Sequence, residues 1–149
     1  MRRIRLVPPA YFLLTLLLQL ALDLLLPGAE LLQPAWRWLG WLLLVPAVLL
    51  AAPAARALAR RGTTLHPFGQ PSQLVTDGPY RYTRNPLYLA LACILLAVAV
   101  WLGSLAALLV LPVFCLAITR SFIRHEERVL AAAFGADYVD YCRRVRRWL

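Results

Sequence analysis

The sequence of 149 residues contains no lysine and only seven acidic residues, so that arginine supplies all sixteen basic side chains. Charged residues make up 15% of the chain and hydrophobic residues 62%. Soluble proteins average about a quarter charged and about half apolar residues. A soluble protein of this length could not bury so much apolar surface, and the composition therefore indicates an integral membrane protein of one domain.

Cysteine is also scarce. Cys93, Cys115 and Cys142 show neither the paired spacing of a disulfide framework nor the spacing of zinc ligands. His66 and His125 are lone histidines without ligand spacing. The chain also lacks a phosphate-binding loop, a dinucleotide-binding glycine fingerprint and a nucleophile triad. We therefore expect no metal site and no nucleotide fold of these types.

Four long apolar runs are present, and a helix needs about 20 residues to cross the hydrocarbon core. They are residues 7–26, 39–58, 86–102 and 104–122. Only Gly103 and Ser104 separate the last two runs, which predicts a tight antiparallel helical hairpin. The first run is too long for a signal-peptide core, so we expect it to be a retained span. The sequence predicts an all-α membrane protein with about four transmembrane helices.

Three residues inside the first two runs are unusual for a span. Asp23 is a carboxylate within the first run, and such a residue in an exporter would couple transport to protons. Its place near the end of the run favours a simple position at the membrane interface. Pro46 and Pro53 lie in the second run, where we expect them to kink the helix and to require inward packing.

Arginine distribution predicts the orientation of the spans. Fifteen of the sixteen arginines lie in the N-terminal lead, in residues 56–84 or in the C-terminal region, and only Arg37 follows the first span. By the positive-inside rule, both termini and the long loop are cytoplasmic. The arginines flank apolar runs instead of forming a stripe with interleaved aromatic residues, so topology explains them better than nucleic-acid binding. The Gly- and Pro-rich stretch 62–78 predicts a loop or re-entrant piece against the membrane.

The first polar segment, residues 78–90, combines charge, tyrosine, glycine and proline. Asn85 is a good N-cap residue and Pro86 suits the first position of a helix, so a helix should begin there. The exposed N–H groups of a helix start favour an anion, and Arg81 and Arg84 would add to that preference. In the alternative interpretation these arginines mark topology and the tyrosines belong to an aromatic belt.

The second polar segment, residues 124–128, contains Glu126 and Glu127. Neighbouring helical residues point about 100° apart, so the two carboxylates cannot serve one face. We expect one to bind a cationic or hydroxyl-bearing ligand and the other to pair with Arg124 or Arg128, unless the segment is only a solvated face with local ion pairs. An amphipathic helix should begin after Arg120 and end at Gly135. Both polar segments fall on one side of the membrane, and we predict that they meet in a binding site.

Three ordered motifs resemble the isoprenylcysteine carboxyl methyltransferase family, which is related to the phospholipid N-methyltransferases. They are TDGPYRYTRNPLY at 76–88, RHEE at 124–127 and FGADYVDY at 134–141. Gly62-Thr63-Thr64 is similar to prokaryotic members. The resemblance covers roughly residues 60–149. Together with the apolar runs, it leads us to expect a single polytopic membrane domain over 1–149, with two N-terminal spans in 1–58 and a methyltransferase-like core in 59–149. Asn85 stands where eukaryotic members have His, and Ala90 where many members have Gly.

The resemblance implies S-adenosylmethionine as the methyl donor and a lipophilic or small methyl acceptor. The residues that it implies for cofactor binding are Arg84, Asn85, Pro86, Tyr88, Glu126 and Glu127, and those that it implies for catalysis are Arg124 and Glu127. Direct methyl displacement onto a carboxylate or thiol acceptor depends mostly on positioning and needs no strong base. We expect the acceptor to enter from the bilayer. The alternatives are a phospholipid N-methyltransferase and a non-enzymatic membrane scaffold that retains the motif.

Overall fold

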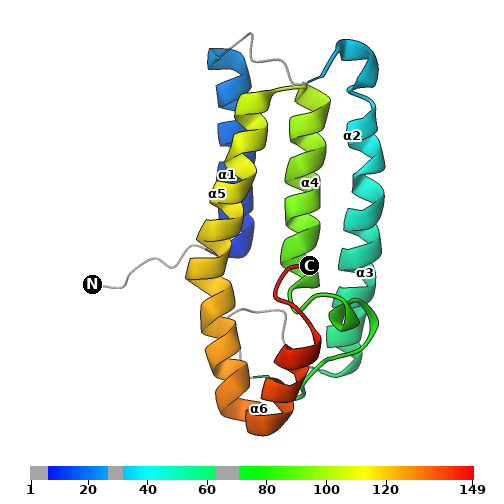
Figure 1. The fold of residues 1–149 in the computed structure, drawn as a ribbon, viewed down its shortest axis with the longest axis vertical. Helices are drawn as coiled ribbons and strands as arrows, with labels where there is room; N and C mark the ends of the chain where they lie inside the picture. Colours follow the sequence, from blue (N-terminus) through cyan, green and yellow to red (C-terminus); the bar gives the residue numbers. More distant parts are fainter. Residues whose placement is uncertain (1–6, 27–31, 63–70) are drawn as a thin grey trace, which may run out of the picture. The chain divides into compact units, whose positions relative to one another are not determined.

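The computed structural model describes residues 7–26, 32–62 and 71–149, and in these ranges the chain is helical without β-strands. The longer elements are α1 (Pro8–Leu25), α2 (Leu39–Leu42), α3 (Leu44–Arg60), α4 (Pro86–Leu102), α5 (Leu105–Ile118) and α6 (Arg124–Arg144) (Figure 1). The short turns are the 3-10 turns η1 (Pro34–Trp36) and η2 (Gly78–Arg81) and the π-helical turn η3 (Thr119–Ile123). The predicted all-α class is confirmed.

Three of the described helical stretches are long and apolar enough to cross a membrane: Pro8–Leu25, Pro34–Arg60 and Leu105–Arg144. The remaining predicted span, residues 86–102, corresponds to α4, an apolar helix of 17 residues. At 1.5 Å per residue, α4 is about 26 Å long, slightly less than a hydrocarbon core of about 30 Å. The multi-pass helical character is confirmed, and the count of four and the orientation stay predictions.

Several sequence features lie outside the described residues. They are the basic lead Met1–Arg5, the loop residue Glu30, His66, and Thr63-Thr64 of the prokaryote-like motif. The rest of the predicted loop after Gly62, residues 71–77, contains no helix.

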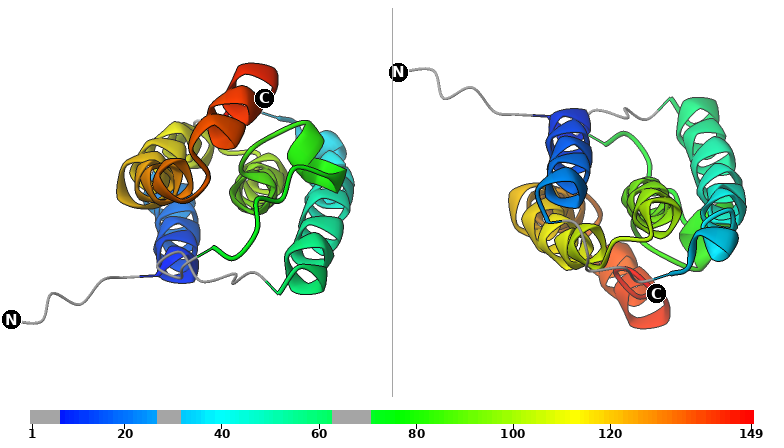
Figure 2. Two further views of the ribbon diagram at one scale, coloured as in Figure 1. Left: turned by 90° about the horizontal axis from the view of Figure 1, so that it is seen from below. Right: turned by 90° about the horizontal axis from the view of Figure 1, so that it is seen from above.

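One compact unit consists of the chain up to Val45 together with Leu91–Ile118. In it α1 runs alongside α5 (Figure 2). The fully buried Gln19 of α1 donates hydrogen bonds from Nε2 to the carbonyl oxygens of Leu95 in α4, at 3.1 Å, and Ala107 in α5, at 3.0 Å. Gly103, with a φ of +69°, makes the turn between α4 and α5. The predicted helical hairpin is confirmed, and one α1 side chain joins both of its arms.

The second predicted span is interrupted. A single helix was expected over 39–58, but the structure has α2 and α3 with a break at Leu43. Pro46 lies in the first turn of α3, where its missing N–H leaves no bond unmade, and only Pro53 lies inside the helix. Gly40 packs α2 tightly, because a Cβ there would lie 2.6 Å from the carbonyl oxygen of Ala97 in α4.

The second compact unit consists of Pro46–Ala90 and Thr119–Leu149. Its long helix α6 bends at Gly135, whose φ of 50° and ψ of −120° break the regular helix (Figure 1). The predicted helix end at Gly135 is therefore borne out, because two helical stretches of α6 meet there and the second continues to Arg144. The returning half buries Tyr138 and Tyr141, and the Tyr141 hydroxyl donates a 2.7 Å hydrogen bond to the carbonyl oxygen of Tyr80. This contact ties the end of the chain to the first polar segment.

Candidate functional site

The first wall of the candidate site is the start of α4. The helix begins at Pro86 as predicted, and the Leu89 N–H donates to the Asn85 carbonyl oxygen at 3.0 Å. Asn85 is buried, and its own N–H donates to the Thr83 hydroxyl at 3.2 Å. Its side-chain amide donates to the carbonyl oxygen of Arg147 at 2.9 Å. Asn85 therefore joins the helix start to the C-terminal end of the chain.

The second wall is the first turn of α6, and it meets the first wall through Glu126. The Tyr88 hydroxyl donates a 2.5 Å hydrogen bond to Glu126 Oε1. The prediction that the two polar segments meet is thereby confirmed. Burial raises the pKa of the Glu126 carboxyl, the hydrogen bond from Tyr88 lowers it, and the negative charge of Glu127 raises it further. Glu126 thus retains a proton at higher pH than an exposed glutamate does.

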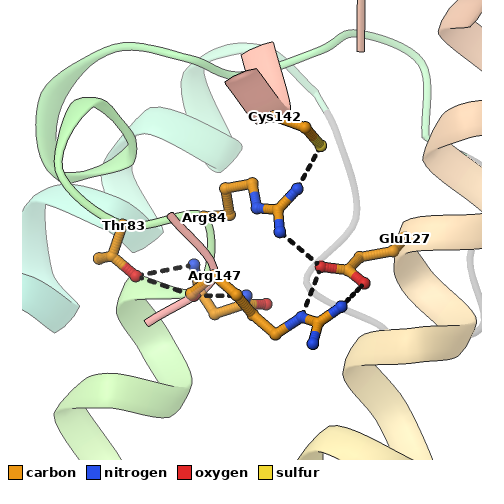
Figure 3. Close-up of polar contacts among 6 residues, drawn as sticks. Thr83, Arg84, Glu127, Cys142 and Arg147 are labelled. Atoms are coloured by element: carbon orange, nitrogen blue, oxygen red, sulfur yellow. Dashed lines mark hydrogen bonds and ion pairs between the residues drawn. The ribbon is translucent and has the colours of Figure 1, made fainter. Parts of the chain in front are cut away.

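The Glu127 carboxylate forms two ion pairs, one with Arg84 and one with Arg147 (Figure 3). Arg84 Nη2 lies 3.1 Å from its Oε1, and Arg147 donates from Nε at 2.9 Å and from Nη2 at 2.6 Å to its two oxygens. The expected pairing with Arg124 or Arg128 is replaced by these contacts, and Arg128 Nε donates instead to the Arg124 carbonyl oxygen at 3.2 Å. A bidentate guanidinium from a distant segment is a stronger partner than a local helical pair.

The C-terminal segment, residues 145–149, is a third wall that sequence reasoning missed. Beside the contacts of its side chain, Arg147 accepts a hydrogen bond from the Thr83 hydroxyl at 3.2 Å through its carbonyl oxygen. The Arg84 N–H donates to the Arg146 carbonyl oxygen at 3.0 Å. In the sequence, Arg146 and Arg147 belong to a basic run that topology alone would explain. Their spacing gives no sign of a contact with Glu127.

Residues of these three segments line one side-open pocket of about 730 Å³. Five of its lining side chains are basic, namely Arg84, Arg120, Arg124, Arg128 and Arg147, and Glu127 is its one acidic lining residue among those described. Arg84 also contacts the Cys142 sulfur, and its buried Nε has no hydrogen-bond acceptor in the part of the chain that the structure describes. The pocket is therefore strongly positive.

The predicted site residues divide into two groups. Arg84, Arg124 and Glu127 line the pocket directly. The others support these residues and are not among the lining side chains: Asn85, Pro86, Tyr88 and Glu126. Their assignment to cofactor binding or catalysis stays a prediction. Ala90 is 2% exposed in the first part of α4.

Parts of the chain are similar to known protein sequences. The phospholipid methyltransferase family model matches residues 35–137, which include both polar segments. The chain is 44% identical over 63 residues to an uncharacterized protein of Haemophilus influenzae, a match that covers 42% of this chain and all of that protein. It is 38% identical over 71 residues to the cobalt-zinc-cadmium resistance protein CzcN of Cupriavidus metallidurans, covering 48% of this chain and 32% of that relative.

No solved structure matches the chain significantly. The family match extends over more than half of the sequence and confirms the resemblance noted from the motifs. Together with helices long and apolar enough to span a bilayer, it identifies a multi-pass membrane protein of methyltransferase type. The chain belongs to the phospholipid methyltransferase family, which contains isoprenylcysteine carboxyl methyltransferase-like members.

Proposed function

We propose that the protein is a methyltransferase that uses S-adenosylmethionine and holds it in the arginine-lined pocket. The observation that carries the proposal is the pocket itself, because Arg84 of the first polar segment and Arg124 and Glu127 of the second line one cavity. Guanidinium groups bind a carboxylate such as that of the methyl donor through charge-assisted hydrogen bonds. The volume of about 730 Å³ also falls within the usual range of ligand pockets.

The side chains present fit the chemical groups of this donor. Arg84 and the start of α4 suit its carboxylate, because guanidinium groups and helix N-termini both favour anions. Glu126 is not a lining residue, but its Oε2 is not used by the hydrogen bond from Tyr88 and would accept from the ribose hydroxyls if the donor extends from the pocket towards Tyr88. When bound, the donor supplies a methyl group activated by its positively charged sulfur.

Glu127 and Asn85 have a supporting role in this proposal. Both oxygens of Glu127 are already engaged by Arg84 and Arg147, and the Asn85 amide is engaged by the Arg147 carbonyl. They would therefore position Arg84 and the helix start, while Arg124, exposed at the pocket, would face the acceptor. This division refines the roles implied by the family resemblance.

The acceptor that we favour is a carboxylate or thiol on a lipophilic or small molecule that arrives from the bilayer at the cytoplasmic side. Such an acceptor needs positioning more than it needs a base. A phospholipid amine is the alternative, and Glu126 is then the candidate to remove its proton because its pKa is raised towards neutrality. Transfer of a labelled methyl group to fractionated lipids and small acids would separate these acceptors.

Calorimetry on the protein in detergent micelles tests donor binding directly. We expect saturable binding of S-adenosylmethionine, weakened at least tenfold by Arg84→Gln and by Glu126→Ala, since each removes a charged hydrogen-bond partner worth about 1.5–3 kcal/mol. Arg143→Gln is the matched control, because Arg143 is an exposed α6 residue paired with Asp140 away from the pocket lining. Absence of binding, together with an unchanged melting temperature at high donor concentration, would favour the scaffold alternative.

A further inference from the structure

The positive charge of the pocket exceeds what its own carboxylate can neutralise. Five guanidinium groups and one carboxylate line it, which amounts to a net charge of +4, five minus one. The carboxylate of Glu127 is already held by Arg84 and Arg147. Among the ion pairs that the described residues form, none includes Arg120, Arg124 or Arg128. Within the described ranges, these three charges therefore line the pocket without a negative partner.

The three arginines form a regular row along the chain. Arg120 lies in η3, and Arg124 and Arg128 follow at intervals of four residues in α6. All three are exposed side chains that line the same pocket. Like charges at this helical spacing repel one another, so the row weakens the helix when it stands alone. Membrane topology requires arginines on one side of the bilayer but does not require them to converge on one pocket.

Guanidinium groups in a pocket are suited to carboxylate and phosphate groups. Arginine presents a planar fork of donors that binds either group in a bidentate manner, and its charge does not titrate in this range. Arg120 follows α5 after one intervening residue, so the row begins where the apolar run of the chain ends. Headgroups of lipids lie at that level of a membrane. The row therefore has the position and the chemistry to hold an anionic headgroup.

The methyl donor cannot serve as this anion. S-adenosylmethionine carries a sulfonium, an ammonium and one carboxylate, and its net charge is +1. Its entry alone would raise the total charge at the pocket from +4 to +5. A second, negatively charged ligand would offset that repulsion, and binding of one ligand must then strengthen binding of the other by the same factor.

We infer that the row of Arg120, Arg124 and Arg128 binds the phosphate or carboxylate headgroup of an amphiphile, and that this anion tightens donor binding. The argument for anion binding uses only the charge of the pocket. The argument that the anion tightens donor binding also rests on the proposed function. The inference deepens that function because it makes the methyl acceptor, or a lipid bound beside it, anionic.

Binding measurements in nanodiscs test both statements. We compare discs of zwitterionic lipid with discs that also contain phosphatidylglycerol, and in a separate arm add inorganic phosphate to the zwitterionic discs. Anionic lipid should lower the dissociation constant of the donor about fivefold or more. The doubly substituted Arg124→Gln/Arg128→Gln should lose this coupling. Arg143→Gln/Arg144→Gln is the matched control, because it removes two exposed arginines of the same helix that do not line the pocket.

The charge of the adenosyl ligand provides a second readout. S-adenosylhomocysteine lacks the sulfonium charge and is neutral overall, so the wild type in zwitterionic discs should prefer it to S-adenosylmethionine. The Arg124→Gln/Arg128→Gln protein should show a smaller preference, because less positive charge repels the sulfonium. Equal preference in both proteins would contradict the argument from pocket charge.

Direct binding of spin-labelled phosphatidylglycerol separates the two proposals. Preferential association that disappears in Arg124→Gln/Arg128→Gln supports the anion site even if no donor binds, and in that case only the proposed function fails. Donor binding that is independent of lipid charge and of phosphate would overturn the inference and leave the proposed function standing. A phosphate effect equal to that of the lipid would support recognition of the anion itself.

Discussion

Removal of Glu127 should destabilise the protein more than removal of Arg147, although the two side chains share one ion pair. The side chains of Arg84 and Glu127 are 14% and 18% exposed, and that of Arg147 is 38% exposed. Breaking a buried ion pair from one side costs about 3–5 kcal/mol because the partner charge stays buried. Since Glu127 retains some exposure, we expect Glu127→Ala to cost about 3 kcal/mol, the lower end of that range.

Arg147→Ala should cost about 1–1.5 kcal/mol, the usual value for hydrogen bonds to a charged group at a partly exposed position. Glu127 would keep Arg84 as a partner, and the Arg147 carbonyl could still accept hydrogen bonds from Thr83 and Asn85. In the double variant, loss of Arg147 should cost little beyond the loss of Glu127. A coupling energy of about 1–1.5 kcal/mol is therefore expected.

Denaturant unfolding in detergent micelles, followed by helical circular dichroism, provides the four free energies of this cycle. Arg143→Ala is the control, because its pair with Asp140 is exposed on both sides, and it should change stability by no more than about 0.5 kcal/mol. Equal costs for Glu127→Ala and Arg147→Ala would refute the view that Glu127 is the shared centre of two cations. A coupling energy near zero would refute the ion pair itself.

Two further substitutions probe other buried polar groups. Burial raises the pKa of Glu126, so the folded protein binds this proton more tightly than the unfolded chain, and stability should fall as pH rises from the unfolded value of 4.5 through the folded one. Glu126→Gln should flatten this slope in unfolding experiments at several pH values, and an unchanged slope would contradict the assignment. Gln19→Leu should cost about 1 kcal/mol through loss of two hydrogen bonds to helix carbonyls, measured by the same unfolding assay. A stability equal to that of the wild type would show that these bonds contribute nothing in the membrane-like phase.

The helices were the most predictable part of the fold. The apolar run 7–26 became α1 over Pro8–Leu25, and the run 86–102 became α4 with the same bounds. Hydrophobic run length and the prolines and glycines between runs are local properties, so they can be read directly from the sequence. The break at Leu43 and the continuation of α6 beyond Gly135 could not be read in this way. Both depend on packing with other segments, as the close approach of Gly40 to Ala97 shows.

By itself, the sequence determined the membrane class, the start of α4 at Pro86, and the motifs that join the chain to its family. Only the tertiary structure decided that Glu127 pairs with Arg84 and Arg147 and that five arginines converge on one pocket. The partners of an ion pair depend on which segments the fold brings together. Helical spacing in the sequence predicts only pairs three or four residues apart.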